Sequence, residues 1–233
     1  MPTLALLVET SNEACSVALA DITRADAPRV LAEAEETTPM RHTAVLLPLI
    51  RAAFAKTDHE LADLSAVAVS TGPGSYTALR AGYASAKGLC MALDLPLIEV
   101  STMRALASVA SEMPDFEQVD YVHAVLPARR SEVYYACYTA DLDLAQKPMP
   151  QTVDAAWINS LREAGPLRFA GPNLSLVSPL LNTADKVAEV VLHARNLLKI
   201  TAFKYSNKAF TELSNAAPLY VKPPYITRAK PRL

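Results

Sequence analysis

The stretch that decides the fold is Val67–Leu93, "VAVSTGPGSYTALRAGYASAKGLCMAL". It opens with a short apolar run, turns through "TGPGS" and continues as an uninterrupted run of residues compatible with a helix. Glycine adopts positive φ and allows another backbone or a phosphate to approach closely, and Ser75 is a favourable helix N-cap. The stretch therefore predicts a strand, a tight turn and a helix.

Two interpretations of this turn stay open. Free N–H groups at the start of a helix bind anions, so Gly72, Gly74 and Ser75 are candidates for holding a phosphate. The spacing, however, matches neither the P-loop nor the G-x-G-x-x-G pattern, and a purely structural turn explains the glycines equally well.

The helix after the turn carries two faces of small or apolar side chains. Such a helix is buried on two sides, so one face covers its own sheet and the other predicts a partner helix. The first face holds Tyr76, Leu79, Tyr83, Lys87 and Cys90, and the second holds Ala78, Gly82, Ser85 and Leu89.

A second predicted helix, residues 41–56, is apolar nearly all round. Its large side chains cannot all face one sheet, and the surplus predicts a helical interface with another chain. They are Leu46, Leu47, Leu49, Ile50 and Phe54. Pro48 either kinks this helix or marks a later start.

Two hairpins open the two halves of the chain. Strands at 4–8 and 15–20 flank "ETSNEA", and strands at 121–126 and 133–141 flank "PARRSE". Internal duplication and chance similarity are both possible explanations for the likeness of the two hairpins. Further strands are predicted at 29–35, 97–100 and 167–170, and further helices after Ser101, at 154–164 and at 184–200.

Composition sets the broad class. The chain has 233 residues, 51% of them hydrophobic and 20% charged, which is typical of one large domain or two lobes. A net charge of −2 argues against broad electrostatic binding of nucleic acid. Cys15, Cys90 and Cys137 lie in separate apolar runs, which indicates buried thiols in a reducing compartment. With no leader-like segment and no apolar run near about 18 residues, we expect a cytoplasmic protein without a membrane span.

Residues for metal binding or nucleophilic catalysis are not grouped in the sequence. The four histidines are far apart, without the H-E-x-x-H spacing, and are interpreted as surface or capping residues. Ser75 lies outside the G-x-S-x-G pattern and has no base placed to activate it. We therefore predict no metal and no catalytic residue.

Five segments resemble the TsaB/YeaZ family, and together they cover nearly the whole chain. They are "TGPGSYTALRAG", "VETSNEACSVAL", "RHTAVLLPLI", "ARRSEVYYACY" and "PLYVK". The resemblance implies an α/β fold of two actin-like lobes (ASKHA, ribonuclease H-like), with mixed sheets flanked by helices. Residues 1–99 would form the lobe that carries the dimerisation helices and 100–202 the second lobe, with 203–233 as a candidate to rejoin the first.

The family implies a non-catalytic subunit of the complex that forms N6-threonylcarbamoyladenosine (t6A) at position 37 of tRNAs reading ANN codons. Its implied partners are the catalytic paralogue TsaD, the small ATPase TsaE, a second copy when alone, and tRNA only through the complex. The predicted interface comprises Leu46, Leu47, Ile50, Phe54, Tyr76, Leu79, Arg80, Tyr83 and Lys87.

The chain departs from the family at catalytically relevant positions. Glu9 stands where the family usually has Asp, and Pro127 replaces the acid of "DAR", while Ala78 and Ala81 differ within the glycine motif. We therefore expect a degenerate kinase-like scaffold without its own cofactor, ATP and Mg²⁺ being used by the complex. A vestigial nucleotide cleft is predicted at Glu9, Thr10, Ser11, Gly72, Gly74 and Ser75.

Several alternatives remain. A stand-alone actin-like ATPase or small-molecule kinase would hold nucleotide and metal with the same cleft residues. A glycoprotein-directed protease would need a nucleophile or metal set that cannot be named here. Glu132 is expected to pair with Arg129, and the basic tail "RAKPRL" is either solvated or in contact with a phosphate backbone.

Overall fold

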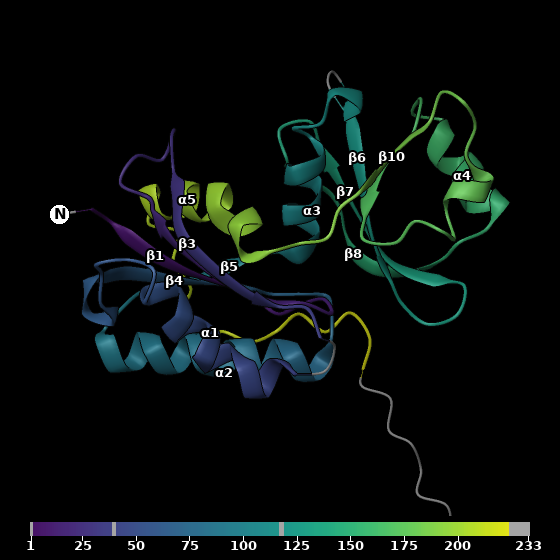
Figure 1. The fold of residues 1–233 in the computed structure, drawn as a ribbon. Helices are drawn as coiled ribbons and strands as arrows, with labels where there is room; N and C mark the ends of the chain where they lie inside the picture. The colour runs from purple at the N-terminus through teal and green to yellow at the C-terminus, as the bar shows by residue number, and fades with distance from the viewer. Residues whose placement is uncertain (1, 39–40, 117–118, 224–233) are drawn as a thin grey trace, which may run out of the picture.

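The computed structural model describes residues 2–38, 41–116 and 119–223 and shows two lobes, each built on a five-stranded sheet (Figure 1). The first sheet has the order β3-β2-β1-β4-β5. Strands β1 to β3 are antiparallel, whereas β4 and β5 run parallel to β1. The bounds are β1 Leu4–Glu9, β2 Cys15–Asp21, β3 Arg29–Glu36, β4 Leu64–Ser70 and β5 Leu97–Val100.

The second sheet repeats this plan. Its order β10-β9-β6-β7-β8, taken from the other edge, places an antiparallel three-stranded unit beside two parallel strands. The bounds are β6 Tyr121–Pro127, β7 Glu132–Thr139, β8 Leu144–Thr152, β9 Arg168–Gly171 and β10 Lys186–Glu189. The two-lobed α/β fold is confirmed, and the repeated strand order favours duplication over chance for the paired hairpins.

Helices cover both faces of the first sheet. Helices α1 (His42–Phe54) and α2 (Tyr76–Leu93) lie on one face, and the 3-10 helix η4 (Ala194–Leu197) with α5 (Leu198–Ser206) lies on the other (Figure 1). Leu6 and Val8 of β1 point into the core under α1 and α2, while Ala5 and Leu7 point into the core under α5. Burial on both faces explains why β1 and β4 are continuously apolar rather than alternating.

The second lobe is covered by α3 (Thr102–Ala110) on the face toward the first lobe and by α4 (Ala155–Arg162) on the other. As predicted, Ser101 caps α3, because its Oγ accepts a hydrogen bond from the amide of Arg104. The short 3-10 helices η1 (Leu61–Asp63), η2 (Pro114–Phe116) and η3 (Ser178–Leu180) complete the elements. After β10 the chain returns to the first lobe, where the amide of Thr211 bonds to the carbonyl of Leu97.

The predicted helix at 184–200 is wrong. Residues 186–189 form β10, and only residues from Ala194 onward are helical. Buried Val190 and Leu192 alternate with exposed Val187 and Val191, a period of two that belongs to extended chain rather than to a helix. The sequence analysis also missed β8, a mostly polar edge strand that tolerates Pro148 and Pro150.

Three further predictions concern the start of α1, the state of the cysteines and the absence of a membrane-spanning helix. Helix α1 begins at His42 and contains Pro48, so the alternative of a later start is wrong. The three cysteines are buried and free, as predicted. In the part of the chain that the structure describes, no helix has the length and apolar character needed to cross a membrane.

Candidate functional site

The turn between β1 and β2 is closed by its own polar groups. The carboxyl of Glu9 is fully buried, and the amide and hydroxyl of Ser11 both donate to its Oε1. Its Oε2 has no hydrogen-bond partner among the described residues. Burial raises the pKa of Glu9 to about 7, against the opposing effect of the Ser11 hydrogen bonds. A buried carboxyl whose charged form is disfavoured and whose Oε1 is bonded within its own loop is a poor ligand for Mg²⁺.

The glycines of the motif serve close packing against this turn. A Cβ on Gly74 would lie 2.2 Å from the carbonyl oxygen of Ser11, and one on Gly82 would lie 2.4 Å from Oγ1 of Thr10. The amide of Ser75 donates to the same Ser11 carbonyl at 2.9 Å. Gly72 has a φ of +96°, which disfavours any side chain. These contacts favour the structural interpretation of the turn.

The predicted nucleotide cleft is therefore filled at this position. Glu9, Thr10, Ser11 and Gly72 are buried, and only Gly74 and Ser75 of the predicted set are exposed. The correction has a physical reason: Gly74 and Gly82 draw α2 against the β1–β2 turn, which leaves no room between them. Ser75 occupies the N-cap position of α2, but its side chain makes no capping hydrogen bond.

An open cavity of about 700 Å³ lies next to this closed turn, between the two lobes. The first lobe contributes the start of α2, the second lobe contributes the β6–β7 hairpin, and the C-terminal segment contributes the remaining wall. The lining residues are Pro73, Gly74, Tyr76, Ala128, Arg129, Tyr134, Leu219, Tyr220, Val221, Lys222 and Pro223. We call this the interlobe cavity.

The C-terminal segment 219–223 bridges the lobes along this cavity. The amide of Leu219 donates to the carbonyl of Thr71 at 2.8 Å, and the ring of Tyr220 lies 4.8 Å from that of Tyr76. Lys222 then pairs with the carboxylate of Glu132. The predicted contacts of "RAKPRL" lie outside the described residues.

The predicted interface residues divide into two groups. Leu46, Ile50, Phe54, Leu79 and Tyr83 are buried within the chain's own core, which corrects their assignment as surface contacts. The hydroxyl of Tyr83 donates to Glu99, and the ammonium group of Lys87 donates to the carbonyl of Ala216. The polar groups of Tyr83 and Lys87 are therefore bonded within the chain itself. Periodicity showed which residues share a helix face, but it did not show which face meets the sheet.

The outward faces of α1 and α2 form a second candidate surface, which we call the helical face. Leu47, with 56% of its surface exposed, and Met91, with 73%, are its largest apolar side chains. Exposed small or apolar residues of the same two helices include Ala44, Pro48, Ala52, Ala84 and Gly88. Tyr76 and Arg80 are exposed at the start of α2, where Arg80 donates to the Tyr76 hydroxyl. Met91 was missed because a single methionine in an apolar helix is indistinguishable from a core residue.

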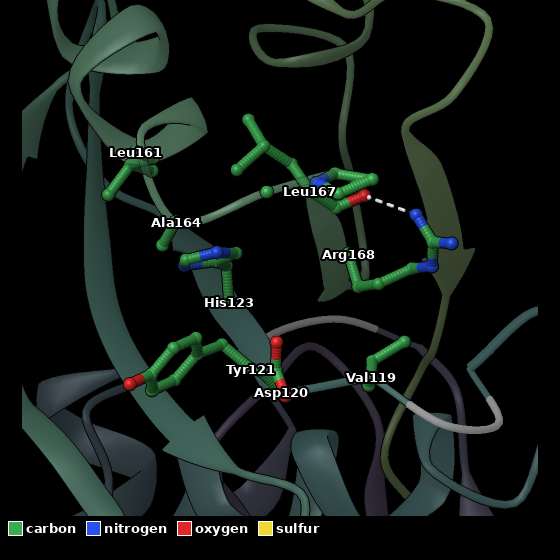
Figure 2. A pocket seen from close by; sticks show the side chains of 10 residues that line it. Val119, Asp120, Tyr121, His123, Leu161, Ala164, Leu167 and Arg168 are labelled. Carbon is green, nitrogen blue, oxygen red and sulfur yellow. Dashed lines mark hydrogen bonds between the residues drawn. The ribbon is translucent and has the colours of Figure 1, made fainter.

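A smaller cavity of about 110 Å³ lies under α4 in the second lobe. Figure 2 shows the imidazole of His123 beneath Leu161 and Ala164, with Asp120 and Arg168 at the rim. Burial lowers the pKa of His123 to about 4, so its ring is neutral, and Nδ1 lies 3.0 Å from the Tyr135 hydroxyl. His123 and His42 are thus buried residues, a correction to their interpretation as surface or capping histidines.

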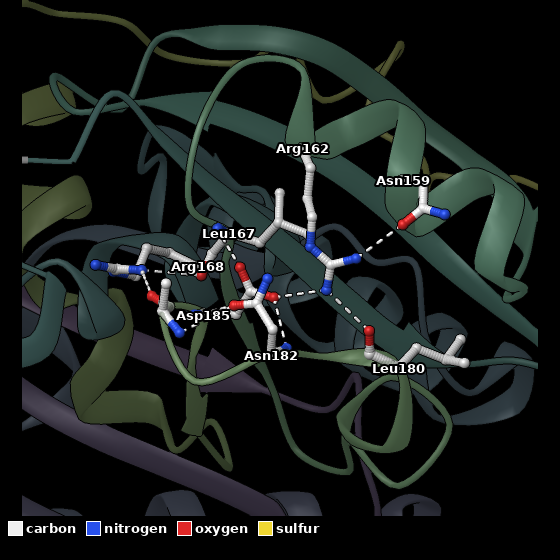
Figure 3. Close-up of polar contacts among 8 residues, drawn as sticks. Asn159, Arg162, Leu167, Arg168, Leu180, Asn182 and Asp185 are labelled. Carbon is white, nitrogen blue, oxygen red and sulfur yellow. Dashed lines mark hydrogen bonds and ion pairs between the residues drawn. The ribbon is translucent and has the colours of Figure 1, made fainter.

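The polar groups beside this smaller cavity stabilise loops. Figure 3 shows the buried carboxylate of Asp185 accepting from the side chain of Arg162 at 2.7 Å and from the amides of Leu167 and Asn182 at 2.9 Å. Arg168 donates to three backbone carbonyls. Across residues 2–38, 41–116 and 119–223, no three His, Cys, Asp or Glu side chains are grouped as a metal site.

Comparison with known proteins identifies the family. The model of the TsaD family, described as tRNA N6-adenosine threonylcarbamoyltransferase, matches residues 34–174. YeaZ from Pseudomonas aeruginosa superposes with a TM-score of 0.75 at 28% identity, covering 94% of this chain and 99% of that one. The chain belongs to the TsaD family, in its TsaB/YeaZ branch.

Curated relatives agree with this assignment. The tRNA threonylcarbamoyladenosine biosynthesis protein TsaB of Haemophilus influenzae is 38% identical over 131 residues, 56% of this chain and 52% of that protein. The match to the first relatives therefore spans about half of their length. TsaB of Bacillus subtilis is 27% identical over 224 residues, 93% of both chains.

Proposed function

We propose that this member of the TsaB/YeaZ family is a non-catalytic subunit in the formation of t6A at position 37 of tRNAs reading ANN codons. In this role it pairs through the helical face with the catalytic paralogue TsaD, and with a second copy when alone, while the ATPase TsaE acts on the assembled complex. The relatives named TsaB support the pathway. The observation that carries the proposed mode of action is the helical face itself.

The helical face is suited to pairing because it is apolar and rigidly supported. Leu47 and Met91 are its most exposed large apolar side chains, and the exposed small residues of α1 and α2 allow a partner helix to approach closely. Helix α2 cannot shift freely, since Gly74 and Gly82 pack it against the β1–β2 turn. A partner docked on α1 and α2 would therefore contact a fixed surface, which is what a scaffold requires.

The cleft chemistry favours a scaffold over a stand-alone ATPase or kinase. Such an enzyme needs an ionised carboxylate facing its nucleotide. Glu9 is instead buried, its pKa is raised to about 7, and it is bonded to Ser11. The second lobe carries Pro127 at the position where the family has an acid.

Reconstitution with one omission tests the proposal. Purified threonylcarbamoyl-adenylate synthetase, TsaD, TsaE, tRNA, threonine, bicarbonate and ATP are incubated with and without this chain, and t6A is quantified by mass spectrometry. We expect product only when the chain is present. Equal product in its absence would remove the assigned function.

A further inference from the structure

A third cavity lies between α3 of the second lobe and α5 of the first lobe (Figure 1). Its volume is about 370 Å³, and we call it the α3–α5 pocket. The pocket borders the β7–β8 turn, whereas the interlobe cavity borders the β6–β7 turn. These turns lie at opposite ends of β7, so the α3–α5 pocket is separate from the interlobe cavity.

Arg104 brings a positive charge into this pocket without a counter-ion. Its Nε is fully buried and has no hydrogen-bond partner among the described residues. None of the ion pairs in the described part of the chain includes Arg104. A second cation is close, because burial and then the charge of Arg104 lower the pKa of Lys204 on α5. A buried donor left unpaired beside another cation costs folding free energy, which a bound anion would offset.

Two acids also line the pocket, but neither neutralises Arg104. Glu112 on α3 pairs with Lys199 on α5 at 2.8 Å, so these two charges offset each other. Asp141 is exposed in the β7–β8 turn and takes part in no ion pair with another described residue. Its negative charge opposes a ligand that carries several negative charges. One uncompensated guanidinium therefore suits a singly charged anion such as a carboxylate.

The remaining lining combines hydroxyl groups with an apolar wall. Ser108 and Ser111 follow Arg104 at helical spacing, so all three residues share one face of α3. The wall opposite is formed by Ile200, which is buried, and by Phe203, which keeps 58% of its surface exposed at the rim. The pocket thus presents a polar side on α3 and an apolar side on α5.

The β7–β8 turn closes the pocket with an unusual residue. Leu142 has a φ of +61°, a conformation that bulky side chains rarely adopt. Its side chain is half-buried and packs against the core shared by the two lobes. The turn therefore places an apolar side chain against the pocket where glycine or asparagine would fit the backbone better.

We propose that the α3–α5 pocket binds a small carboxylic acid with an apolar body, the carboxylate against Arg104 and the body against Ile200 and Phe203. Arginine binds a carboxylate in a bidentate manner, which would supply the partner that the buried Nε lacks. A volume of about 370 Å³ is within the usual size of a small-ligand site. The ligand would contact both lobes, because Arg104 belongs to the second lobe and Phe203 to the first. This binding goes beyond the scaffold role.

Titration of the full chain with hydrocinnamate, followed by the amide chemical shifts of the protein, tests this site. Two further probes separate its parts: hydrocinnamamide has the same body without the charge, and propionate has the charge without the aromatic ring. Arg104→Gln should weaken hydrocinnamate binding roughly tenfold or more, the loss expected for a charged hydrogen bond. Phe203→Ala, at the exposed rim, should weaken it about fivefold through lost apolar contact.

Arg51→Gln is the matched control for Arg104→Gln. It makes the same change at an exposed position on α1, outside the pocket, and should alter the affinity by less than about twofold. Thermal unfolding without a probe checks that each variant is folded. If Arg104→Gln does not fold, Arg104→Lys keeps the charge but loses the bidentate geometry and should still weaken binding.

Saturable binding of hydrocinnamate, weakened by the Arg104 and Phe203 variants and tighter than that of both further probes, would support the site. Absence of saturable binding, equal affinity for hydrocinnamamide, or unchanged affinity in the pocket variants would overturn it. The titration contains neither TsaD nor tRNA, so the pocket and the scaffold role fail separately.

Discussion

The two lobes have the same strand order but differ in the segment that joins their parallel strands. In the first lobe, β4 and β5 are joined through α2, a helix of 18 residues. In the second lobe the equivalent segment between β9 and β10 contains only η3, a 3-10 helix of three residues. The two sheets share one strand order, and the connection between the parallel strands is where the surfaces of the two lobes differ.

The first hairpin turn of each lobe shows a second contrast. The β1–β2 turn is closed around Glu9 and Ser11 and sealed by Gly74. The β6–β7 turn exposes Arg130 and presents Arg129 to the interlobe cavity. The first hairpin turn therefore holds the buried acid Glu9 in the first lobe and the exposed cations Arg129 and Arg130 in the second lobe.

The largest effect should come from placing a charge under α2. Leu79 is 1% exposed, so Leu79→Glu buries a carboxylate without a partner and should lower the free energy of unfolding by about 4 kcal/mol. Urea denaturation measures this change. Leu47→Glu is the control on the outward face of α1, where 56% of the side chain is exposed, and it should change the stability of the isolated chain by less than about 0.5 kcal/mol. Equal stability of the two variants would show that α2 does not pack as described.

Loss of the turn packing should have the next largest effect. In Gly74→Ala the new methyl meets the Ser11 carbonyl at 2.2 Å, so the turn must shift, and we expect destabilisation of about 3 kcal/mol. Gly88→Ala is the matched control, because no atom lies within 4 Å of its Cβ position on the exposed side of α2. That variant should gain about 0.5–1 kcal/mol from helix propensity. Thermal unfolding of both would show whether the motif acts by packing.

The buried acid predicts a pH dependence of stability. The pKa of Glu9 is raised from 4.5 to about 7 in the folded chain, so folding favours the protonated form. The contribution of Glu9 to the free energy of unfolding is fully present below pH 4.5 and is lost as the pH rises to 7. The pKa shift corresponds to a loss of about 3 kcal/mol over this range. Glu9→Gln should flatten this part of the profile, whereas Glu13→Gln, which changes an exposed residue, should leave it in place. An unchanged slope in Glu9→Gln would contradict the buried position of the carboxyl.

The smallest predicted effect concerns pairing through the helical face. Leu47→Glu and Met91→Glu should each weaken association with TsaD by about 2 kcal/mol, roughly thirtyfold, because a charge would be buried against the partner. Leu144→Glu, at a 48% exposed site on β8, is the control and should pair normally. Analytical ultracentrifugation of the mixtures gives the affinities. Normal pairing of both face variants would place the interface elsewhere.

Much of the architecture could be predicted from local sequence. Both hairpins, the strand and helix around the glycine motif, the Ser101 cap and the free buried cysteines are present as expected. Each depends on residues that are close in the chain, such as an N-cap three residues from its amide or strands joined by a short turn. The helix predicted at 184–200 was wrong because the apolar side chains there fit both a helical and an extended periodicity. Pairing of β10 with β9 selects the extended conformation.

The candidate site was less predictable, because its geometry depends on contacts between distant segments. Sequence alone established that two helices have surplus apolar surface and that Glu9 replaces the usual acid. Tertiary structure decided that Leu79 and Tyr83 point inward while Leu47 and Met91 point outward. It also decided that Gly74 seals one hairpin turn and that residues 219–223 bring Tyr220 and Lys222 beside Arg129. The physical reason is that periodicity defines a face of a helix or strand, but only packing determines what that face contacts.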